Sequence, residues 1–344
     1  MNLSSALRFL FTHSARQHRR RKSARRAAVA ERLEHRIVLS SISVSGNTVF
    51  YNAAPGEANN LTISESAGTL TFSDTGAVIT PGTGPITVVN ANEVTVPVAG
   101  ITTLNVGLGD MNDTLDGSGV GIGSGITLGI FNGGTGNDNL IGTEVTDSFA
   151  AFDTQPGNDT IDGLGELPGQ RDTIRINSDL DVTATDTAMV IGTSVSSYAN
   201  LEFIDVQGGA SDNQINLSGI TTAGSFTSVQ INAGDGHDTI LGSQLADSVT
   251  ISGTNPGADD LNLGGQPAGQ QDNLRISTDL DVTISDTGLI VGGTIASHLN
   301  VERVNIDGGP SANVIDLNAI TGASTLVSTQ VNAGDGDDTI IGSQ

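Results

Sequence analysis

The segment Asn232-Ala-Gly-Asp-Gly-His-Asp-Thr-Ile-Leu-Gly-Ser-Gln244 recurs almost unchanged as Asn332-Ala-Gly-Asp-Gly-Asp-Asp-Thr-Ile-Ile-Gly-Ser-Gln344, and this recurrence is the main evidence for the fold. The two copies end a longer repeat: residues 172–244 align without gaps to residues 272–344, with 36 identities in 73 positions. A weaker third copy, residues 132–142, keeps the same offset of 100 residues. Such an internal repeat predicts similar units stacked on one another, each covering part of its neighbour.

Within the repeat, apolar residues alternate with polar ones over short segments. Segments 182–184, 201–206, 214–217 and 227–231 show this period of two, which is typical of a half-buried β-strand. Gly, Asn, Asp and Pro separate the segments, and no stretch after residue 41 has a helical period. Aromatic residues are only 3% of the chain, so we expect a core of thin stacked layers of Ile, Val and Leu.

The repeat predicts an all-β fold, namely a right-handed parallel β-solenoid or β-roll-like array preceded by a short basic tail. We expect the tail at 1–40, a divergent first repeat at 41–143, a second at 144–243 and a third at 244–344. The third copy stops just after its glycine-rich turn, so we expect this chain to be a fragment of a longer array. For residues 41–131, packing as a separate β-sandwich is an open alternative.

The formal net charge of −24 hides a split between the tail and the body. Residues 1–40 carry ten Lys and Arg against two Glu, or +8, whereas residues 41–344 carry four Arg against 36 Asp and Glu, or −32. The acidic body would repel nucleic acids and anionic lipid surfaces, so we expect neither as a partner. The absence of Cys excludes disulfides and thiolate metal sites. The sequence also has no apolar run of 18 residues that would predict a transmembrane segment.

The end of the basic tail carries a short motif, Leu33-Glu-His-Arg-Ile-Val-Leu-Ser40. It resembles an "LExR-apolar-LS" segment that begins many large exported proteins of some bacteria. The resemblance covers eight residues and implies an exported protein, located outside the cell or on its surface. The alternative is a flexible basic tail, because no apolar stretch of signal-peptide length follows the basic run.

A glycine-rich turn followed by Asp and an apolar pair is the recurring chemical motif. Clear copies occupy residues 133–141, 233–241 and 333–341, and weaker ones precede Leu115, Ile161 and Leu261. Glycine lets the backbone adopt positive φ and turn its carbonyl groups toward one point, where the Asp adds a carboxylate. Carboxylate and carbonyl oxygens are the ligands of a hard cation, so the motif favours Ca²⁺ over Zn²⁺.

These residues resemble the hemolysin-type (RTX) calcium-binding nonapeptide G-G-x-G-x-D-x-U-x, in which U is a large apolar residue. The resemblance implies a parallel β-roll with Ca²⁺ between successive turns. Carried over by position, the metal-ligating carboxylates would be Asp138, Asp238 and Asp338, with Asp113, Asp159 and Asp259 as weaker candidates. The remaining turn positions would be Gly133, Gly134, Gly136, Gly234, Asp235, Gly236, Gly334, Asp335 and Gly336.

The chain also departs from the RTX pattern. Family turns recur every 18 residues, whereas Asp113, Asp138, Asp159 and Asp172 are separated by 25, 21 and 13 residues. Ala replaces the first glycine of the motif in the second and third copies. These departures favour a looser solenoid with Ca²⁺ at only some turns. The alternative is a set of metal-free turns held by Asx hydrogen bonds.

The sequence therefore predicts an exported, Ca²⁺-binding structural or adhesive repeat protein of the cell surface or extracellular matrix. The expected partners are calcium ions, with cell-surface polysaccharide or other surface proteins as further candidates. The first alternative is a metal-independent β-repeat scaffold for carbohydrate or cell contact. The second alternative is a β-helix polysaccharide lyase.

We expect no enzymatic activity. Arg175 and Arg275 could suggest a lyase, but they recur with the repeat, which is typical of a structural role. His237 stands where the next copy has Asp337, so we expect it to be exposed rather than a ligand.

Overall fold

The computed structural model describes residues 39–152, 157–165, 168–252, 256–322 and 324–343. Residues 1–38, which include the basic run and most of the LExR-type motif, lie outside the described residues. The chain from residue 39 onward belongs to one compact unit. Every regular element in the described residues is a β-strand, so the all-β prediction is confirmed. None of these residues forms a helix that could span a membrane.

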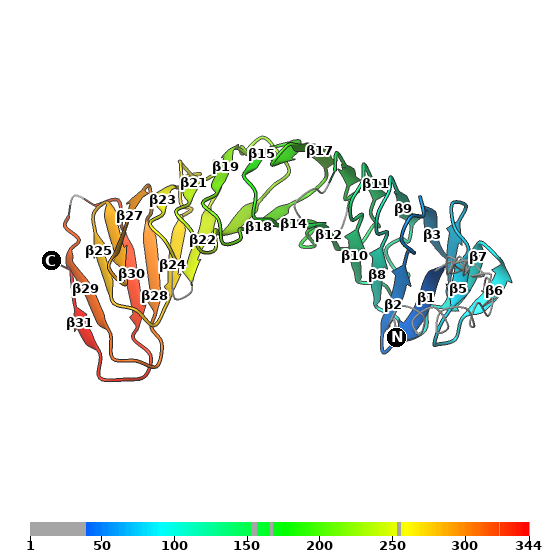
Figure 1. The fold of residues 1–344 in the computed structure, drawn as a ribbon, viewed down its shortest axis with the longest axis horizontal. Helices are drawn as coiled ribbons and strands as arrows, with labels where there is room; N and C mark the ends of the chain where they lie inside the picture. The colour runs from blue at the N-terminus through cyan, green and yellow to red at the C-terminus, as the bar shows by residue number, and fades with distance from the viewer. Residues whose placement is uncertain (1–38, 153–156, 166–167, 253–255, 323, 344) are drawn as a thin grey trace, which may run out of the picture. The chain divides into compact units, whose positions relative to one another are not determined.

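The strands form two sheets, which we name sheet A and sheet B (Figure 1). Sheet A contains β1 (Ser40–Ser45), β2 (Thr48–Asn52), β5 (Ile79–Pro81), β8 (Thr103–Gly107), β10 (Leu128–Asn132), β12 (Asp147–Phe152), β14 (Thr173–Asn177), β18 (Phe203–Gln207), β20 (Ser228–Asn232), β22 (Asp247–Ser252), β24 (Asn273–Ser277), β28 (Arg303–Asp307) and β30 (Ser328–Asn332). Sheet B contains β3 (Asn60–Ser66), β4 (Thr69–Asp74), β6 (Thr87–Asn90), β7 (Glu93–Pro97), β9 (Thr114–Gly119), β11 (Asn139–Ile141), β13 (Thr160–Asp162), β15 (Val182–Thr185), β16 (Ala188–Ile191), β17 (Ser194–Ala199), β19 (Gln214–Gly219), β21 (Thr239–Leu241), β23 (Asp260–Asn262), β25 (Val282–Ser285), β26 (Gly288–Val291), β27 (Thr294–Leu299), β29 (Val314–Ala319) and β31 (Thr339–Ile341).

From β8 onward the chain alternates between the two sheets, and each passage through both is one coil. Neighbouring coils pair in parallel: Thr103 on β8 lies opposite Leu128 on β10, and Thr173 on β14 lies opposite Phe203 on β18. In sheet B, Asn139 on β11 likewise pairs in parallel with Thr114 on β9. This is the stacked parallel arrangement that the repeat predicts.

One coil in each 100-residue repeat contains an antiparallel excursion, residues 182–199 and again residues 282–299. In the first excursion, β15, β16 and β17 pair antiparallel in succession. Strand β17 pairs in parallel with β13 of the preceding coil, and β15 pairs in parallel with β19 of the following one. Strands β25, β26 and β27 repeat this arrangement.

The N-terminal end of the unit is closed by antiparallel pairs. Strand β1 pairs with β2, β3 with β4, and β7 with both β4 and β6. Strands β2 and β3 also pair in parallel with β8 and β9. Residues 41–131 therefore belong to the same two sheets as the later repeats, and they do not form a separate sandwich.

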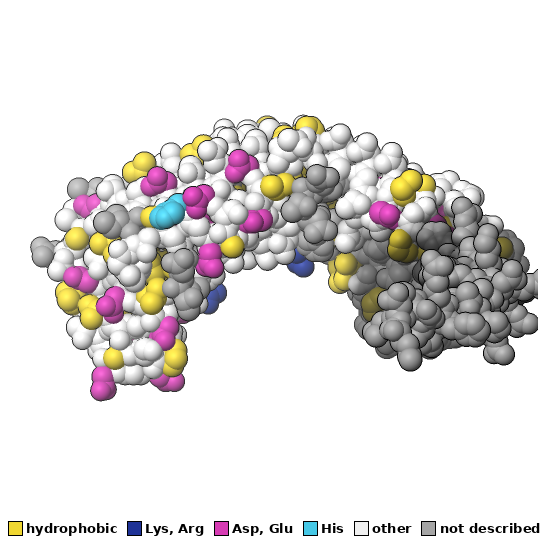
Figure 2. Space-filling view, viewed as in Figure 1, with side chains coloured by type: hydrophobic (Ala, Val, Ile, Leu, Met, Phe, Trp, Pro, Cys, Tyr) yellow, Lys and Arg dark blue, Asp and Glu magenta, His cyan; other side chains and the backbone are white. Residues whose placement is uncertain are grey.

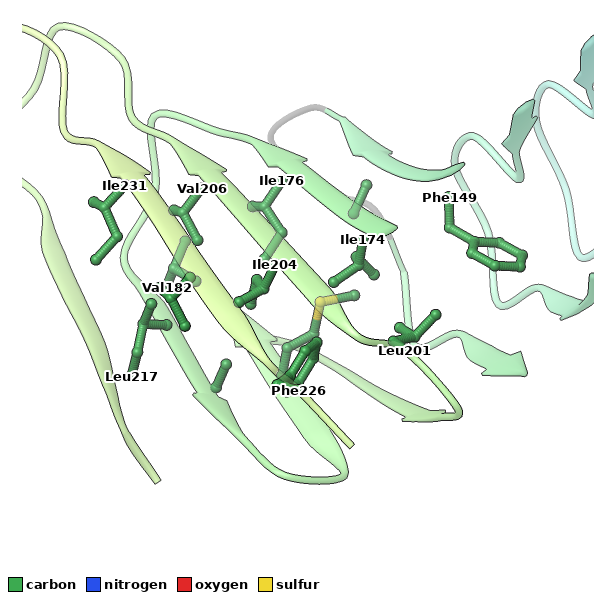
Figure 3. Packing of buried hydrophobic residues seen from close by; sticks show 14 of the residues in the cluster. Phe149, Ile174, Ile176, Val182, Leu201, Ile204, Val206, Leu217, Phe226 and Ile231 are labelled. Atoms are coloured by element: carbon green, nitrogen blue, oxygen red, sulfur yellow. The ribbon is translucent and has the colours of Figure 1, made fainter. Parts of the chain in front are cut away.

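The core lies between the two sheets and consists of stacked aliphatic layers. Ile174, Ile204 and Val229 occupy matching positions on β14, β18 and β20, and each is almost completely buried. Figure 3 shows how such residues from successive coils lie in rows. Burial of one such side chain contributes about 1.5–3 kcal/mol, so many thin layers replace a large aromatic core.

Candidate functional site

The glycine turns lie where the chain enters sheet B. The clear motif copies lead directly into β11, β21 and β31, so equivalent turns of successive coils lie beside each other. In the first copy, Asp110 and Thr135 form an isolated parallel bridge between two stacked turns. The turns predicted to bind metal therefore form a row along one edge of the coils.

Glycine at these turns permits direct contact between coils. Gly157 has a φ of +95°, and a Cβ there would stand 1.4 Å from the carbonyl oxygen of Gly136 in the preceding turn. A Cβ on Gly136 would stand 1.6 Å from the carbonyl oxygen of Met111. The backbones of successive turns thus touch, and only glycine fits between them. Positive φ is shared by Gly134, Gly136, Gly234, Gly236, Gly334 and Gly336.

The motif aspartates form a coil-to-coil ladder of hydrogen bonds. The Oδ1 atom of Asp138 accepts the backbone N–H of Asp113 at 2.9 Å, and Asp159 accepts that of Asp138 at 3.0 Å. The second repeat matches this, since Asp259 accepts the N–H of Asp238 at 3.0 Å. We call this set the inner ladder: Asp113, Asp138, Asp159, Asp238, Asp259 and Asp338.

The inner ladder begins at an Asn in each repeat. The N–H groups of Asn59, Asn213 and Asn313 donate to Asp113, Asp238 and Asp338 at 2.7, 2.8 and 2.8 Å. The backbone N–H groups of these three Asn residues lie at a corner of the coil, outside the regular sheet pairing. The ladder carboxyls provide the acceptors that these donors need.

Burial raises the pKa of five inner-ladder carboxyls. Loss of hydration raises the pKa of Asp113 to about 7 and that of Asp259 to about 7, and a neighbouring ladder carboxylate adds to both shifts. Burial also raises the pKa of Asp159 and of Asp238 to about 6, and it raises the pKa of Asp138. Accepted N–H bonds oppose the rise without cancelling it.

Several oxygens of the turns predicted to bind calcium already accept hydrogen bonds within the protein. One oxygen of each ladder carboxylate already accepts a backbone N–H. In the turn that precedes the first clear copy, the carbonyl of Gly109 accepts the N–H of Thr135 at 2.9 Å. Among the residues that the structure describes, no three His, Asp or Glu side chains come close enough to hold one metal ion. Calcium binding therefore stays a prediction.

The other predicted turn residues lie around the ladder without forming a second set of ligands. Gly133 packs against the ladder, since a Cβ there would stand 2.2 Å from Oδ2 of Asp138. Asp235 and Asp335 have exposed side chains, and their backbone N–H groups donate to Gly209 and Gly309 at 3.0 Å. They lie on the solvent side of the turn, away from the buried carboxyls.

A second row of side chains, which the sequence analysis missed, runs along the solvent side of the same turns. Asn112 accepts the N–H of Asn137 at 2.9 Å, and Asn137 accepts that of Asn158 at 2.8 Å. In the next repeat, Nδ1 of His237 accepts the N–H of Ala258 at 3.0 Å. We call this row the outer ladder: Asn112, Asn137, Asn158, Asp212 and His237. Each of these side chains directly precedes an inner-ladder Asp, or in the case of Asp212 the Asn at which the ladder begins, and that spacing was the signal in the sequence.

A third row, the sheet-A ladder, holds the coils where the chain enters sheet A. Asp172 accepts the N–H of Asp147 at 2.7 Å, and Glu202 accepts that of Asp172 at 2.9 Å. Asp247, Asp272 and Glu302 repeat the arrangement at 2.8 and 2.9 Å. Burial raises the pKa of Asp247 to about 6 and that of Asp272 to about 7. Recurrence of these acids at the 100-residue offset was the signal in the sequence.

No protein-family model matches this chain, and no curated protein matches it. The resemblance to RTX repeats therefore rests on the motif residues alone. The geometry at those residues supports one chemical role directly, which is acceptance of backbone N–H groups between coils.

Proposed function

We propose that this chain is a structural repeat scaffold whose coils are held together by its own buried carboxyl groups. The observation that carries the proposal is the inner ladder, in which a side chain of one coil satisfies a backbone donor of the coil before it. Glycines that let the turns touch complete this junction. Both features recur at the repeat offset, which a junction between like units requires.

An enzymatic role has less support than a structural one. The sheet-A ladder acids have equivalent backbone partners in both repeats. A catalytic centre needs a unique arrangement, so acids that keep the same structural partner in each repeat are better explained as supports. The location of the scaffold, at the cell surface or in the extracellular matrix, is proposed from the LExR-type motif at residues 33–40.

A calcium-stabilised scaffold is the second candidate, and one observation favours it. The Oδ2 atoms of Asp113, Asp138 and Asp238 are buried and have no hydrogen-bond partner among the described residues. A buried carboxylate oxygen of this kind needs either a proton or a cation. At neutral pH the pKa of Asp113, about 7, lets a proton occupy its carboxyl part of the time, whereas the pKa of Asp238, about 6, leaves that carboxyl mostly ionised.

Thermal unfolding of the whole chain, followed by circular dichroism, separates the two candidates. We expect the β-sheet signal and the melting temperature at neutral pH to be the same in millimolar Ca²⁺ and in excess EDTA. Mg²⁺ at equal concentration is the control for a general effect of divalent ions on an acidic protein. A β-sheet signal that forms only with Ca²⁺ would overturn the proposal and establish the calcium-stabilised candidate.

A further inference from the structure

The outward face of sheet A carries a polar groove in the last described coils. It crosses strands β20, β22, β24, β28 and β30 and has a volume of about 380 Å³. Its lining consists of Gln230, Ser248, Thr250, Asn273, Arg275, Asn305, Ile306, Asp307 and Gln330. The one apolar lining residue, Ile306, is 1% exposed, so polar groups form the accessible surface.

Two paired groups form the floor of this groove. The guanidinium of Arg275 donates to Oδ2 of Asp307 from Nε at 2.9 Å and from Nη2 at 2.8 Å. The amide of Asn305 donates to Oδ1 of Asn273 at 2.7 Å. These hydrogen bonds hold the guanidinium of Arg275 and the amide of Asn305 in place on the sheet. The charges of Arg275 and Asp307 cancel, so the pair adds no net charge to the groove.

The other polar side chains of the groove are available to a ligand. Gln230, Ser248, Thr250 and Gln330 make no side-chain hydrogen bond within the described residues. The parallel register sets Thr250, Arg275, Asn305 and Gln330 in one row across four strands. Neighbouring strands are about 4.8 Å apart, so the row offers hydrogen-bonding groups at regular intervals along the array.

Charge restricts the class of ligand. Residues 41–344 carry a net charge of −32, which would repel a polyanion. Figure 2 shows acidic side chains scattered over the viewed face, with Lys and Arg atoms only at its margin. The groove itself combines donors and acceptors with a neutralised ion pair. Hydroxyl groups both donate and accept hydrogen bonds, so an uncharged, hydroxyl-rich polymer matches this surface.

The groove is not a general property of the repeat. One repeat earlier, Ile130 stands at the position of Gln230, and Ala150 stands at that of Thr250. Arg175, the equivalent of Arg275, retains an acidic partner, with its Nε 3.4 Å from Oδ2 of Asp205. The equivalent positions on sheet A therefore occur in both repeats, and only those of the later repeat are all polar on the outward face.

From these observations we infer that the groove on β20–β30 binds an uncharged polysaccharide. The inference deepens the proposed scaffold function and rests on it, because the groove exists only where the coils are folded and stacked. The ligand would lie across the strands, with its hydroxyl groups on the row from Thr250 to Gln330.

Affinity electrophoresis of the whole chain tests the inference. The gels contain dextran, β-1,3-glucan or mannan, and parallel gels contain the carboxymethylated or sulfated form of each polymer. We expect retardation by at least one uncharged polymer and none by the anionic forms. Arg275→Ala should weaken the retardation about tenfold, because it removes the central donor and leaves Asp307 unpaired.

Two variants control for the fold. Arg175→Ala makes the same change one repeat earlier on the same sheet face, where the side chain is 51% exposed against 55% for Arg275, and it should keep full retardation. The double variant Gln230→Ala, Gln330→Ala removes side chains without protein hydrogen bonds, so it should stay folded and lose retardation.

Absence of retardation by every uncharged polymer, or equal retardation of Arg275→Ala and Arg175→Ala, would overturn the inference. Circular dichroism of the same samples shows separately whether the scaffold itself has failed to fold.

Discussion

At the residue scale, the buried aspartates combine two opposed properties. The carboxyls of Asp113, Asp138, Asp159, Asp238 and Asp259 each provide an acceptor that a backbone N–H needs, and each carries a charge that its buried position disfavours. The Asn at the start of each ladder contributes only its backbone N–H to the ladder, and the Oδ1 atoms of Asn59, Asn213 and Asn313 accept no hydrogen bond among the described residues. We expect that the coil junction uses the acceptor of the carboxyl and not its charge.

Substitutions of Asp138 should separate these two properties. We expect Asp138→Asn to be more stable than Asp138→Ala at pH 8, because it keeps an acceptor for the N–H of Asp113 and removes a buried charge. Asp138→Ala should cost about 1–3 kcal/mol, since the N–H of Asp113 would be buried without a partner. Denaturant unfolding at pH 8 measures both values. A loss in the Asn variant equal to that in the Ala variant would contradict this account.

Gly157 gives the second prediction at this scale. We expect Gly157→Ala to destabilise the chain by about 2 kcal/mol or more, because a Cβ would stand 1.4 Å from a carbonyl oxygen and the φ is +95°. Gly169→Ala is the matched control, since Gly169 has the same φ of +95° and no heavy atom lies within 4 Å of its Cβ position. The control should cost only about 1 kcal/mol, from the positive φ alone. Equal melting temperatures for the two variants would show that the turns do not stack as described.

At the scale of the element, the antiparallel excursions are attached to the next coil by surface aspartates. Asp179 accepts the N–H groups of Ala210 and Ser211 at 2.8 Å, and Asp186 accepts the N–H and hydroxyl of Thr221 at 2.7 Å. These accepted bonds lower the pKa of Asp179, with Ser211 as the main donor. Asp279 and Asp286 make the equivalent attachments one repeat later.

Removal of one attachment should loosen an excursion locally. We expect Asp186→Ala to increase amide hydrogen exchange across residues 182–199 about five- to tenfold, because Thr221 loses both bonds. Exchange in residues 282–299 should not change. Asp235→Ala removes an exposed acid whose side chain makes no described hydrogen bond, and it should leave both excursions as they are. Faster exchange in the two excursions alike would indicate global destabilisation instead.

The elements also show how far the sequence alone could lead. The alternating segments at 182–184, 201–206, 214–217 and 227–231 correspond to β15, β18, β19 and β20. The excursions were not predicted, because a period of two is the same for a strand in either direction. The role of Asp138 was also not determined by its motif. A glycine turn with an inward carboxylate suits a cation and a backbone N–H alike, and only the coil-to-coil geometry distinguishes them.

At the scale of the whole molecule, the buried carboxyls link stability to pH. Asp113, Asp259 and Asp272 have a pKa of about 7 in the folded chain, against an ordinary pKa of 3.8 for an aspartate side chain. The folded chain therefore binds more protons than the unfolded chain between about pH 4 and pH 7. Their contribution is fully present below this window and is lost as the pH rises through the folded pKa values.

We therefore expect the melting temperature to fall from pH 5 to about pH 7 and to level off by pH 8. Each such group contributes up to about 1.4 kcal/mol per pH unit within the window. Circular dichroism at constant ionic strength measures the slope, and high salt separates surface repulsion from the effect of buried groups. The double variant Asp113→Asn, Asp259→Asn should have a shallower slope. A melting temperature that rises with pH would refute the assignment.

The ladders have a direction, and this bears on how the chain folds during synthesis. In the inner ladder an earlier coil donates to a later one, as Asp113 does to Asp138. In the outer ladder a later coil donates to an earlier one, as Asn137 does to Asn112. A newly synthesised coil can therefore form its outer-ladder hydrogen bond to the preceding coil at once. Its inner-ladder N–H has no acceptor until the following coil has been synthesised. Both hydrogen bonds of a coil would then be complete only after the next coil has been synthesised. The coils would therefore assemble in order, starting from the first one.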